Sequence, residues 1–443
     1  MRHSRNLIII VLSAVLIFQT GRLWYDGLPS GSFFTAQQKE EPLNLALAQT
    51  MLAKPFRIVT NFGNNRFAVD YCDTFTVEQQ TAIDGVIKEM LRNPEFVGIS
   101  EINWNELLKD KSLIYEYKFN MPSDVFAMCM DVSATYFTSR ISEFNSIYLI
   151  PGDDSGTTRI FFLTGGNAAE FRLTGSKTQV LLREIGERAK TLGSAYYVSS
   201  KLENRSMFSG NCFLPSWSSV VYTYNHVNQT NPYSSDGSVL LNSVEKKIDV
   251  FFDNPAVKWI SSPNGVFIFS DQYTFVKYYD DGLLEVNNSR VAEKNQDTLL
   301  TAYAAALSVT GQDDTLTNSF YLADYSLKDG TYTLCFDITV NNMPLFLSDK
   351  TSEKIALDHM FEVSVSNGAV LKYRRYVARF EVDKTSTSDI TFGYANVLMF
   401  DPMINGMDWI IDSFDLAYIA ESDMLSLYWR PVAAGRHYAT YAQ

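Results

Sequence analysis

The stretch Leu113-Ile114-Tyr115-Glu116-Tyr117-Lys118-Phe119 indicates the fold class, because its side chains alternate between the two sides of an extended chain. The odd-numbered residues are all Leu, Tyr or Phe, whereas Glu116 and Lys118 lie between them. A period of two predicts a β-strand that packs one face against a core and carries charged groups on the other.

The segments upstream and downstream of this strand predict an antiparallel sheet with few helices. Phe56–Phe62 has the composition of a strand, and Thr76 with Gln79 forms a capping-box pattern at the start of a helix. Asn93-Pro94 ends that helix. The segment Pro151–Gly156 has turn chemistry between two short apolar segments and predicts a β-hairpin.

Two later regions each predict one helix followed by a meander of strands. An apolar stripe from Leu240 to Phe252 predicts the first helix, and Asn295 is expected to cap a second helix that ends at Gly311. Strands then dominate, including one predicted over residues 370–382. Strands and helices do not alternate as they do in parallel sheets, which favours antiparallel pairing.

We therefore predict an α+β fold, with an N-terminal transmembrane helix followed by three small domains built on antiparallel sheets with one or two helices each. Tight hairpin turns are expected at Asn341-Asn342 and Asn367-Gly368. The predicted domains are an N-terminal extracytoplasmic domain over 55–205, a middle helix-plus-meander domain over 206–292 and a C-terminal helix-plus-meander domain over 293–443.

The first residues of the chain predict a membrane anchor. A basic stub, Met1–Asn6, precedes the uncharged run Leu7–Phe18, and the apolar segment extends to Tyr25. That length approaches the roughly 20 residues that a spanning helix needs. The predicted divisions are a cytoplasmic stub over 1–6, a transmembrane anchor over 7–25 and a tether over 26–54. The anchor side chains are expected to be Leu7, Ile10, Leu12, Val15, Phe18, Leu23 and Trp24.

A cleaved signal peptide is the alternative interpretation of the same residues. Signal peptidase prefers small residues, whereas Gln19–Tyr25 contains bulky and charged groups, and this favours a retained anchor. Arg2 and Arg5 favour a cytoplasmic N-terminus by the positive-inside rule. We expect a single-pass cell-membrane protein whose bulk is extracytoplasmic.

The composition predicts a folded protein with an acidic surface. The 443 residues include 50 acidic and 37 basic side chains, and the formal net charge is −13. Such a surface repels nucleic acid and anionic lipid, so no nucleic-acid partner is expected. Four cysteines lie far apart: Cys72, Cys129, Cys212 and Cys335. They could form two disulfides in any of three pairings, but the favoured interpretation is that some of them are buried thiols.

A search for chemistry along the sequence predicts no enzyme. None of the histidines, His3, His226, His359 and His437, has metal-ligand spacing, and no cofactor or metal site is expected. The segment around Ser155 faintly resembles a serine-protease nucleophile, but turn chemistry is the favoured interpretation. The acidic pairs are predicted to be solvated turn residues: Asp153/Asp154, Asp280/Asp281 and Asp313/Asp314.

The order of several short motifs resembles the YycH family of membrane-anchored regulators of a Gram-positive two-component sensor kinase. The matching segments are Leu23-Trp24-Tyr25, Pro55-Phe56-Arg57-Ile58-Val59, Ser100-Glu101-Ile102-Asn103-Trp104, Tyr115–Pro122, Phe251–Pro255, Asn264-Gly265 and Leu284-Glu285. The C-terminal half is also similar to the sister regulator YycI, in its meander and in Trp429-Arg430.

The resemblance implies an extracytoplasmic protein of three domains that regulates a sensor histidine kinase of cell-wall homeostasis. It implies protein contact with that kinase and with a sister regulator of YycI type, through both anchor and ectodomain. It implies no enzyme activity. Two alternatives stay open on the residues: a cell-envelope binding module for a peptide or glycan, with an exposed aromatic groove, and a secreted hydrolase.

Retention of the anchor can be measured directly. We expect protein purified from native membranes to have an intact mass that includes Leu7–Trp24, because no favourable cleavage site follows the apolar run. Intact-mass spectrometry of the membrane and medium fractions checks this. A shorter chain in the medium, cut between Gly21 and Gly27, would instead support the secreted alternative.

Overall fold

The computed structural model describes residues 44–74, 76–152, 156–175, 177–191, 196–216, 222–235, 238–263, 265–289, 297–390, 393–400, 410–421, 424–433, 436–437 and 440–441. These residues belong to one compact unit that begins at Asn44. They form an α+β fold with mainly antiparallel sheets, as predicted, and two of these sheets are larger than the small predicted domains suggested. The predicted stub, the anchor with its seven side chains and most of the tether lie outside the described residues.

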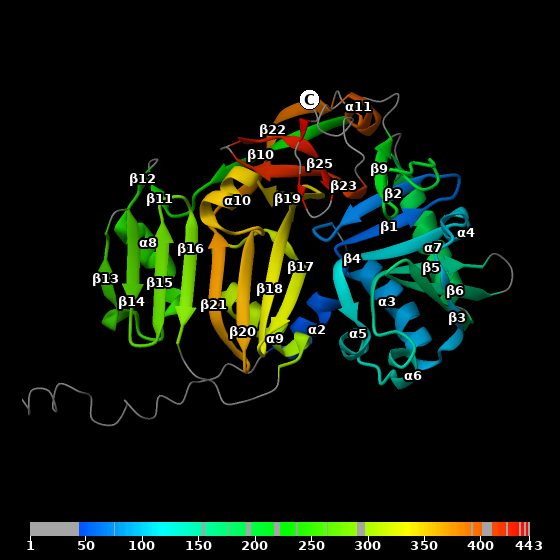
Figure 1. Ribbon diagram of the computed structural model, residues 1–443, viewed down its shortest axis with the longest axis horizontal. Coiled ribbons are helices and arrows are strands. Elements are labelled where there is room, and N and C mark those ends of the chain that lie inside the picture. Colours follow the sequence, from blue (N-terminus) through cyan, green and yellow to red (C-terminus); the bar gives the residue numbers. More distant parts are fainter. Residues whose placement is uncertain are drawn as a thin grey trace, which may run out of the picture. The chain divides into compact units, whose positions relative to one another are not determined.

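The N-terminal half forms a nine-stranded sheet in the order β3-β7-β6-β5-β4-β1-β2-β8-β9 (Figure 1). Strand β4, which contains the alternating stretch, lies inside it between β5 and β1. The strand bounds are β1 Arg57–Asn61, β2 Phe67–Tyr71, β3 Glu95–Glu101, β4 Ser112–Pro122, β5 Glu143–Pro151, β6 Thr157–Thr164, β7 Asn167–Thr174, β8 Tyr196–Ser199 and β9 Phe213–Ser216.

Two amphipathic helices cover one face of this sheet. Helix α3 (Val77–Arg92) has the predicted capping box between Thr76 and Gln79. The hydroxyl of Tyr115 donates to Asp84 of α3 at 3.2 Å, which places α3 on the Tyr115 face. The remaining helices of this half are α2 Leu45–Ala53, α4 Trp104–Lys109, α5 Ser123–Cys129, α6 Thr135–Thr138 and α7 Lys177–Thr191, which contacts β4, β5 and β6.

The C-terminal half is built on a thirteen-stranded sheet in the order β13-β14-β15-β16-β21-β20-β18-β19-β23-β25-β26, with β17 on β18 and β27 on β25. Its strands are β13 Trp259–Ser261, β14 Val266–Ser270, β15 Thr274–Tyr279, β16 Leu283–Asn288, β17 Ser319–Lys328, β18 Thr331–Val340, β19 Met343–Leu347, β20 Phe361–Ser366, β21 Ala369–Tyr376, β23 Ile411–Ala420, β25 Leu427–Ala433, β26 Arg436–His437 and β27 Thr440–Tyr441. The β19–β23 pair is parallel, which the sequence did not predict.

Two smaller sheets and several helices complete this half. Strand β10 pairs with β22 and β24, and β11 pairs with β12. The bounds are β10 Tyr222–Thr230, β11 Ser234–Ser235, β12 Ser238–Val239, β22 Arg379–Ile390 and β24 Met424–Leu425. The helices are α8 Leu241–Ile248, α9 Leu299–Gln312, α10 Asp349–Ile355 and α11 Tyr394–Phe400, with 3-10 turns η1 Asp249–Phe251 and η2 Pro255–Val257.

Three local predictions differ from the structure. The single strand predicted over 370–382 is two strands, because β22 leaves the large sheet after Tyr376 and pairs with β10. Helix α9 is capped by Thr298, which accepts from the amide of Thr301, and Asn295 lies outside the described residues. The C-terminal part of the predicted tether is helix α2, which contacts α9 and α5.

The large sheet crosses a predicted domain boundary. Strand β16 precedes residue 292 and pairs with β21, which follows it, so the predicted middle and C-terminal domains share one hydrogen-bonded ladder. A shared ladder joins them more tightly than a flexible linker would. The boundaries at 205/206 and 292/293 stay predictions.

The predicted hairpin turn at Asn341-Asn342 joins β18 to β19 and also contacts the N-terminal sheet. Both residues have positive φ, 54° and 56°, as a type I′ turn requires. The Asn342 side chain accepts from the amide of Tyr71 at 2.8 Å, and the Asn342 amide donates to Asp73 at 2.9 Å. The turn therefore connects the two large sheets.

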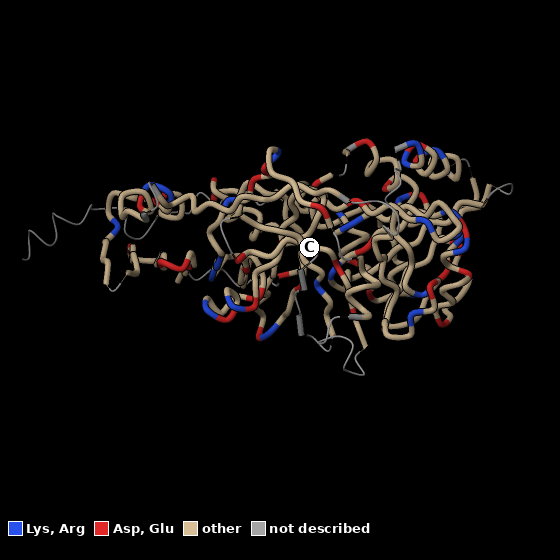
Figure 2. Tube along the Cα trace, turned by 90° about the horizontal axis from the view of Figure 1, so that it is seen from above, with Lys and Arg blue, Asp and Glu red and all other residues tan. Residues whose placement is uncertain are grey.

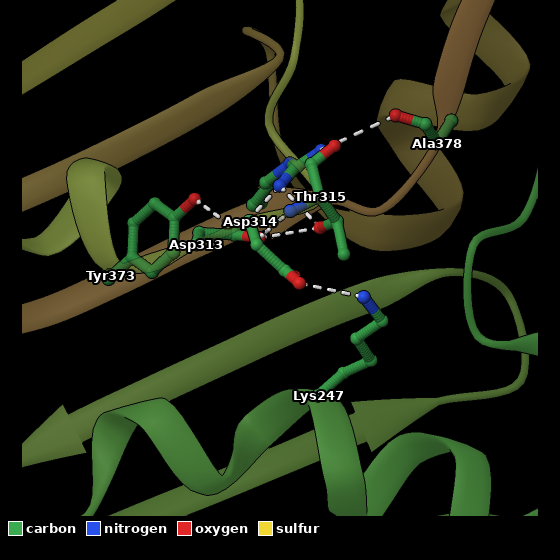
Figure 3. A network of polar contacts seen from close by, with 7 residues as sticks. Lys247, Asp313, Asp314, Thr315, Tyr373 and Ala378 are labelled. Atoms are coloured by element: carbon green, nitrogen blue, oxygen red, sulfur yellow. Dashed lines mark hydrogen bonds and ion pairs between the residues drawn. The ribbon is translucent and has the colours of Figure 1, made fainter.

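The Asp313/Asp314 pair is not a solvated turn as predicted, because Asp313 is buried. Its carboxylate accepts from Arg375 at 2.5 Å and from the hydroxyl of Tyr373 at 3.0 Å (Figure 3). Thr315 donates to the other oxygen through its amide and hydroxyl. Burial alone would raise the pKa of Asp313, but Arg375 and Thr315 hold that pKa below its usual value. This network fixes the end of α9 against β21.

Adjacent carboxylates provide a matched test of this network. We expect Asp313→Asn to lower the free energy of unfolding by about 3–5 kcal/mol, because it leaves the buried Arg375 without its charge partner. The Asp314 side chain is 62% exposed and pairs with Lys247. Asp314→Asn should therefore change the free energy of unfolding by less than about 1 kcal/mol. Urea unfolding of both variants measures the difference. Equal effects would contradict the assigned role of Asp313.

Candidate functional site

A row of side chains crosses the face of the N-terminal sheet that lies opposite helix α3. Strand register aligns Arg57, Glu116, Ser146, Leu163, Ala168 and Ser100 across six strands. Successive side chains on a strand alternate between faces, so this row lies opposite Tyr115 and helix α3. The charged side of the alternating stretch, Glu116 and Lys118, therefore faces away from the helices.

Strand β23 of the C-terminal sheet brings a buried carboxylate onto this face. Asp415 accepts from Arg57 at 3.2 Å and from Lys118 at 3.0 Å, while Arg57 also donates to Glu116 at 2.5 Å. We call these four residues the charge quartet. Its two cations and two carboxylates balance, and the Asp415 side chain is only 3% exposed.

Burial and pairing act in opposite directions on the groups of the charge quartet. Burial would raise the pKa of Asp415, but the positive charges of Lys118 and Arg57 hold that pKa below its usual value. Burial would lower the pKa of Arg57, yet the negative charge of Glu116 contributes to raising it well above its usual value. Both groups are therefore charged at neutral pH, and each depends on its partners to remain so.

A cleft of about 790 Å³ opens beside the charge quartet. Its floor is the row on β4, β5 and β6, and one wall is β23 with the segment before β9. That wall is held together by backbone bonds from Ser209 to Ile411 and from Ile411 to Met207, at 2.9 and 2.7 Å. The opposite rim consists of the β3–α4 corner and the β6–β7 turn, joined by a bond from the Ile102 amide to the Gly166 carbonyl at 3.1 Å.

The structure brings together three of the motifs on which the family resemblance rests. Arg57 from the Pro55–Val59 motif, Trp104 from the Ser100–Trp104 motif and Lys118 from the Tyr115–Pro122 motif all line the cleft. The motif around Phe251–Pro255 is not among the lining residues. The seven anchor residues predicted from the sequence lie outside the described part and stay predictions.

Sequence reasoning missed Asp415 and the segment 209–212 as part of this site. Asp415 interrupts the apolar run Phe414–Ile419, and a single charge in a buried strand was the available signal. Nothing local indicated its partners, because Lys118 is 297 residues away along the chain.

The described histidines give limited support to the hydrolase alternative. His226 lies 2.7 Å from the hydroxyl of Ser388, but its second ring nitrogen has no hydrogen-bond partner among the described residues. A triad would need a carboxylate there. His359 pairs with Asp337 at 3.0 Å, and Ser155 lies outside the described residues. Within the described ranges, no cluster of His, Cys, Asp or Glu could hold a metal ion.

The charges, the cysteines and the helices of the described residues bear on the predicted cellular location of the protein. Acidic and basic residues are interleaved along the described chain (Figure 2). All four cysteines are free thiols, whereas the sequence favoured this state for some of them. Among the helices of the described ranges, none combines the length and the apolar character needed to cross a membrane.

The fold and the cleft define an α+β protein in which a strand of the C-terminal sheet covers part of the polar face of the N-terminal sheet. No protein-family model matches the chain, and no curated protein matches it. YycH from Bacillus subtilis matches in structure, with a TM-score of 0.58, 13% sequence identity and coverage of 89% of this chain and 96% of that chain. The chain therefore has a YycH-like fold, as the sequence motifs predicted.

A second solved structure is more distant. An uncharacterised protein from Eubacterium rectale matches with a TM-score of 0.32 and 12% identity, over 57% of this chain and 90% of that chain. This value is too low to support a structural argument.

The charge quartet can be tested by removing the charge of Asp415. We expect Asp415→Asn to lower the free energy of unfolding by about 3–5 kcal/mol at pH 7, because two cations lose a buried partner. Since the pKa of Asp415 is lowered, its contribution is complete above about pH 4 and disappears as the pH falls through the folded-state pKa. In Asp415→Asn, this part of the pH dependence of the free energy of unfolding should therefore be absent.

Urea unfolding between pH 7 and pH 2 measures both effects. Asp412→Asn, at an exposed position on the same strand, is the matched control and should leave the acid dependence of the wild-type protein in place. If the two variants are equally stable, Asp415 does not have the assigned role.

Proposed function

We propose that this protein is a membrane-anchored extracytoplasmic accessory protein that regulates a two-component sensor histidine kinase of cell-wall homeostasis. The observation that carries the proposal is the YycH-like fold, which extends over 89% of this chain and 96% of YycH. A match over most of both chains supports a shared architecture better than a match limited to one common domain would.

The sequence motifs support the same proposal independently of the overall alignment. The Pro55–Val59, Ser100–Trp104 and Tyr115–Pro122 motifs were identified separately along the chain, and residues from each line the same cleft. Chance matches to short motifs would not be expected to gather at one place in the fold. No catalytic residue, cofactor or metal ion is part of the proposed role.

The proposed location is the cell membrane, with a cytoplasmic N-terminus, one pass over residues 7–25 and the bulk of the chain outside. Apolar helices associate in lipid by close packing, and small residues such as Ser13, Ala14 and Gly21 permit close approach. The proposed partners are the kinase and a sister regulator of YycI type, which this helix and the ectodomain would contact together.

Regulation by contact sets an energetic requirement. A protein that shifts a kinase between two states must bind one state more tightly, and typical coupling free energies are about 1–3 kcal/mol. Contacts of modest size on the anchor and the ectodomain can supply such a difference. The sign of the regulation depends on which state the contacts favour.

Co-purification from native membranes tests the proposed partners. We expect the full-length protein, extracted in mild detergent, to retain a sensor histidine kinase and a sister regulator that mass spectrometry identifies. Replacing Leu7–Trp24 with an unrelated spanning helix of equal length should reduce both the recovery of the kinase and its signalling output, because the packing surface is lost.

The matched control is a pair of single substitutions within the anchor. Ala14→Leu adds bulk at a small position, whereas Val15→Leu changes little in size. We expect the first to weaken recovery of the kinase more than the second. The proposal fails if neither partner is recovered and the exchanged helix leaves signalling intact.

A further inference from the structure

We propose that the cleft beside the charge quartet binds a neutral oligosaccharide. The inference stands on the chemistry of the cleft and goes beyond the regulatory role, which does not require a ligand. The cleft volume of about 790 Å³ is within the roughly 300–1,000 Å³ that is typical of small-ligand sites.

The charges of the lining disfavour an anionic ligand. Its two cations, Arg57 and Lys118, are already bound to Glu116 and Asp415. Glu101 and Asp412 also line the cleft and are exposed. Two cations against four carboxylates give a formal charge of −2, so phosphate groups and acidic polymers are repelled.

The neutral polar groups of the lining suit a ligand rich in hydroxyl groups. Amide side chains and hydroxyls each offer both hydrogen-bond donors and acceptors. A sugar hydroxyl likewise donates one bond and accepts others, so each ring can satisfy several such groups at once. Strand alternation places the hydroxyl of Ser146 on the face of the row and that of Ser413 on the face of Asp415, and Asn211 of the segment before β9 lines the cleft as well.

Trp104 adds an aromatic surface at the rim. It is the first residue of α4, is partly exposed and is one of the residues that line the cleft. An indole ring presents an apolar face together with one N–H donor, which matches the C–H faces and hydroxyls of a sugar ring. A peptide held by an apolar anchor would need a desolvated apolar pocket instead.

The rim is held in place before a ligand arrives. Asn103 caps α4 by accepting from the Glu106 amide at 3.3 Å, and the Ile102 amide is bonded to the Gly166 carbonyl. These bonds fix the corner that carries Trp104 relative to the β6–β7 turn. A rim fixed in this way loses little conformational entropy on binding, which favours affinity for a ligand made largely of hydrogen-bonding groups.

Titration calorimetry on the full-length protein in a sugar-free zwitterionic detergent tests the site. The probes are cellotetraose, maltotetraose and chitotetraose, three neutral tetrasaccharides of different linkage or substitution. We expect at least one to bind with a Kd below about 1 mM. Trp104→Ala and Ser413→Ala should each weaken binding of that probe about tenfold or more, and Trp104→Phe should restore most of the affinity lost in Trp104→Ala.

Trp259→Ala is the matched control, because Trp259 is 80% exposed and does not line the cleft. It should leave binding unchanged. Urea midpoints equal to that of the wild-type protein confirm that the variants are folded, and if Trp104→Ala is unfolded, Ser413→Ala alone decides. The proposal is overturned if none of the three tetrasaccharides binds, or if the cleft variants bind the probe as well as Trp259→Ala does.

Discussion

The pairing of Asp415 with Arg57 and Lys118 is the constraint on which the site depends. Asp415 follows Arg57 by 358 residues and Lys118 by 297 residues in the sequence. The three side chains are largely removed from water. Taking charges out of water costs several kcal/mol per ion, and this cost is offset only when the partners are correctly placed. The position of β23 over the N-terminal sheet is therefore narrowly defined. The wall of the cleft, which β23 forms, is defined with it.

Features that depend on neighbours in the sequence could be predicted, and features that depend on distant partners could not. The capping box at Thr76 and Gln79 was predictable because both members lie within one helical turn. The alternation in β4 correctly placed Glu116 and Lys118 on one face, but it did not indicate that Asp415 would meet them there. The same limit explains Asp313, whose burial depends on Arg375, 62 residues further along the chain.

The YycH-like fold could be predicted although sequence identity with YycH is only 13%. Short segments such as Pro55–Val59 indicate their local structure because strand geometry and burial restrict which residues fit there. The structure adds what the motifs could not show, which is that Arg57, Trp104 and Lys118 face a common cleft. Helix α2 was missed because the prolines, glycines and polar run of the preceding segment suggested a linker, whereas contacts with α9 and α5 stabilise the helix.

The contact between the Asn341-Asn342 turn and the N-terminal sheet can form only late in the synthesis of the chain. Asn342 accepts from the Tyr71 amide, yet it is synthesised 271 residues later. At about 5–20 residues per second, the ribosome needs roughly 15–50 s to cover that interval. During this period the Tyr71 amide of the nascent N-terminal half lacks its partner Asn342. Chaperones can bind the exposed edge near Tyr71 in that interval, and other nascent chains can associate with it prematurely.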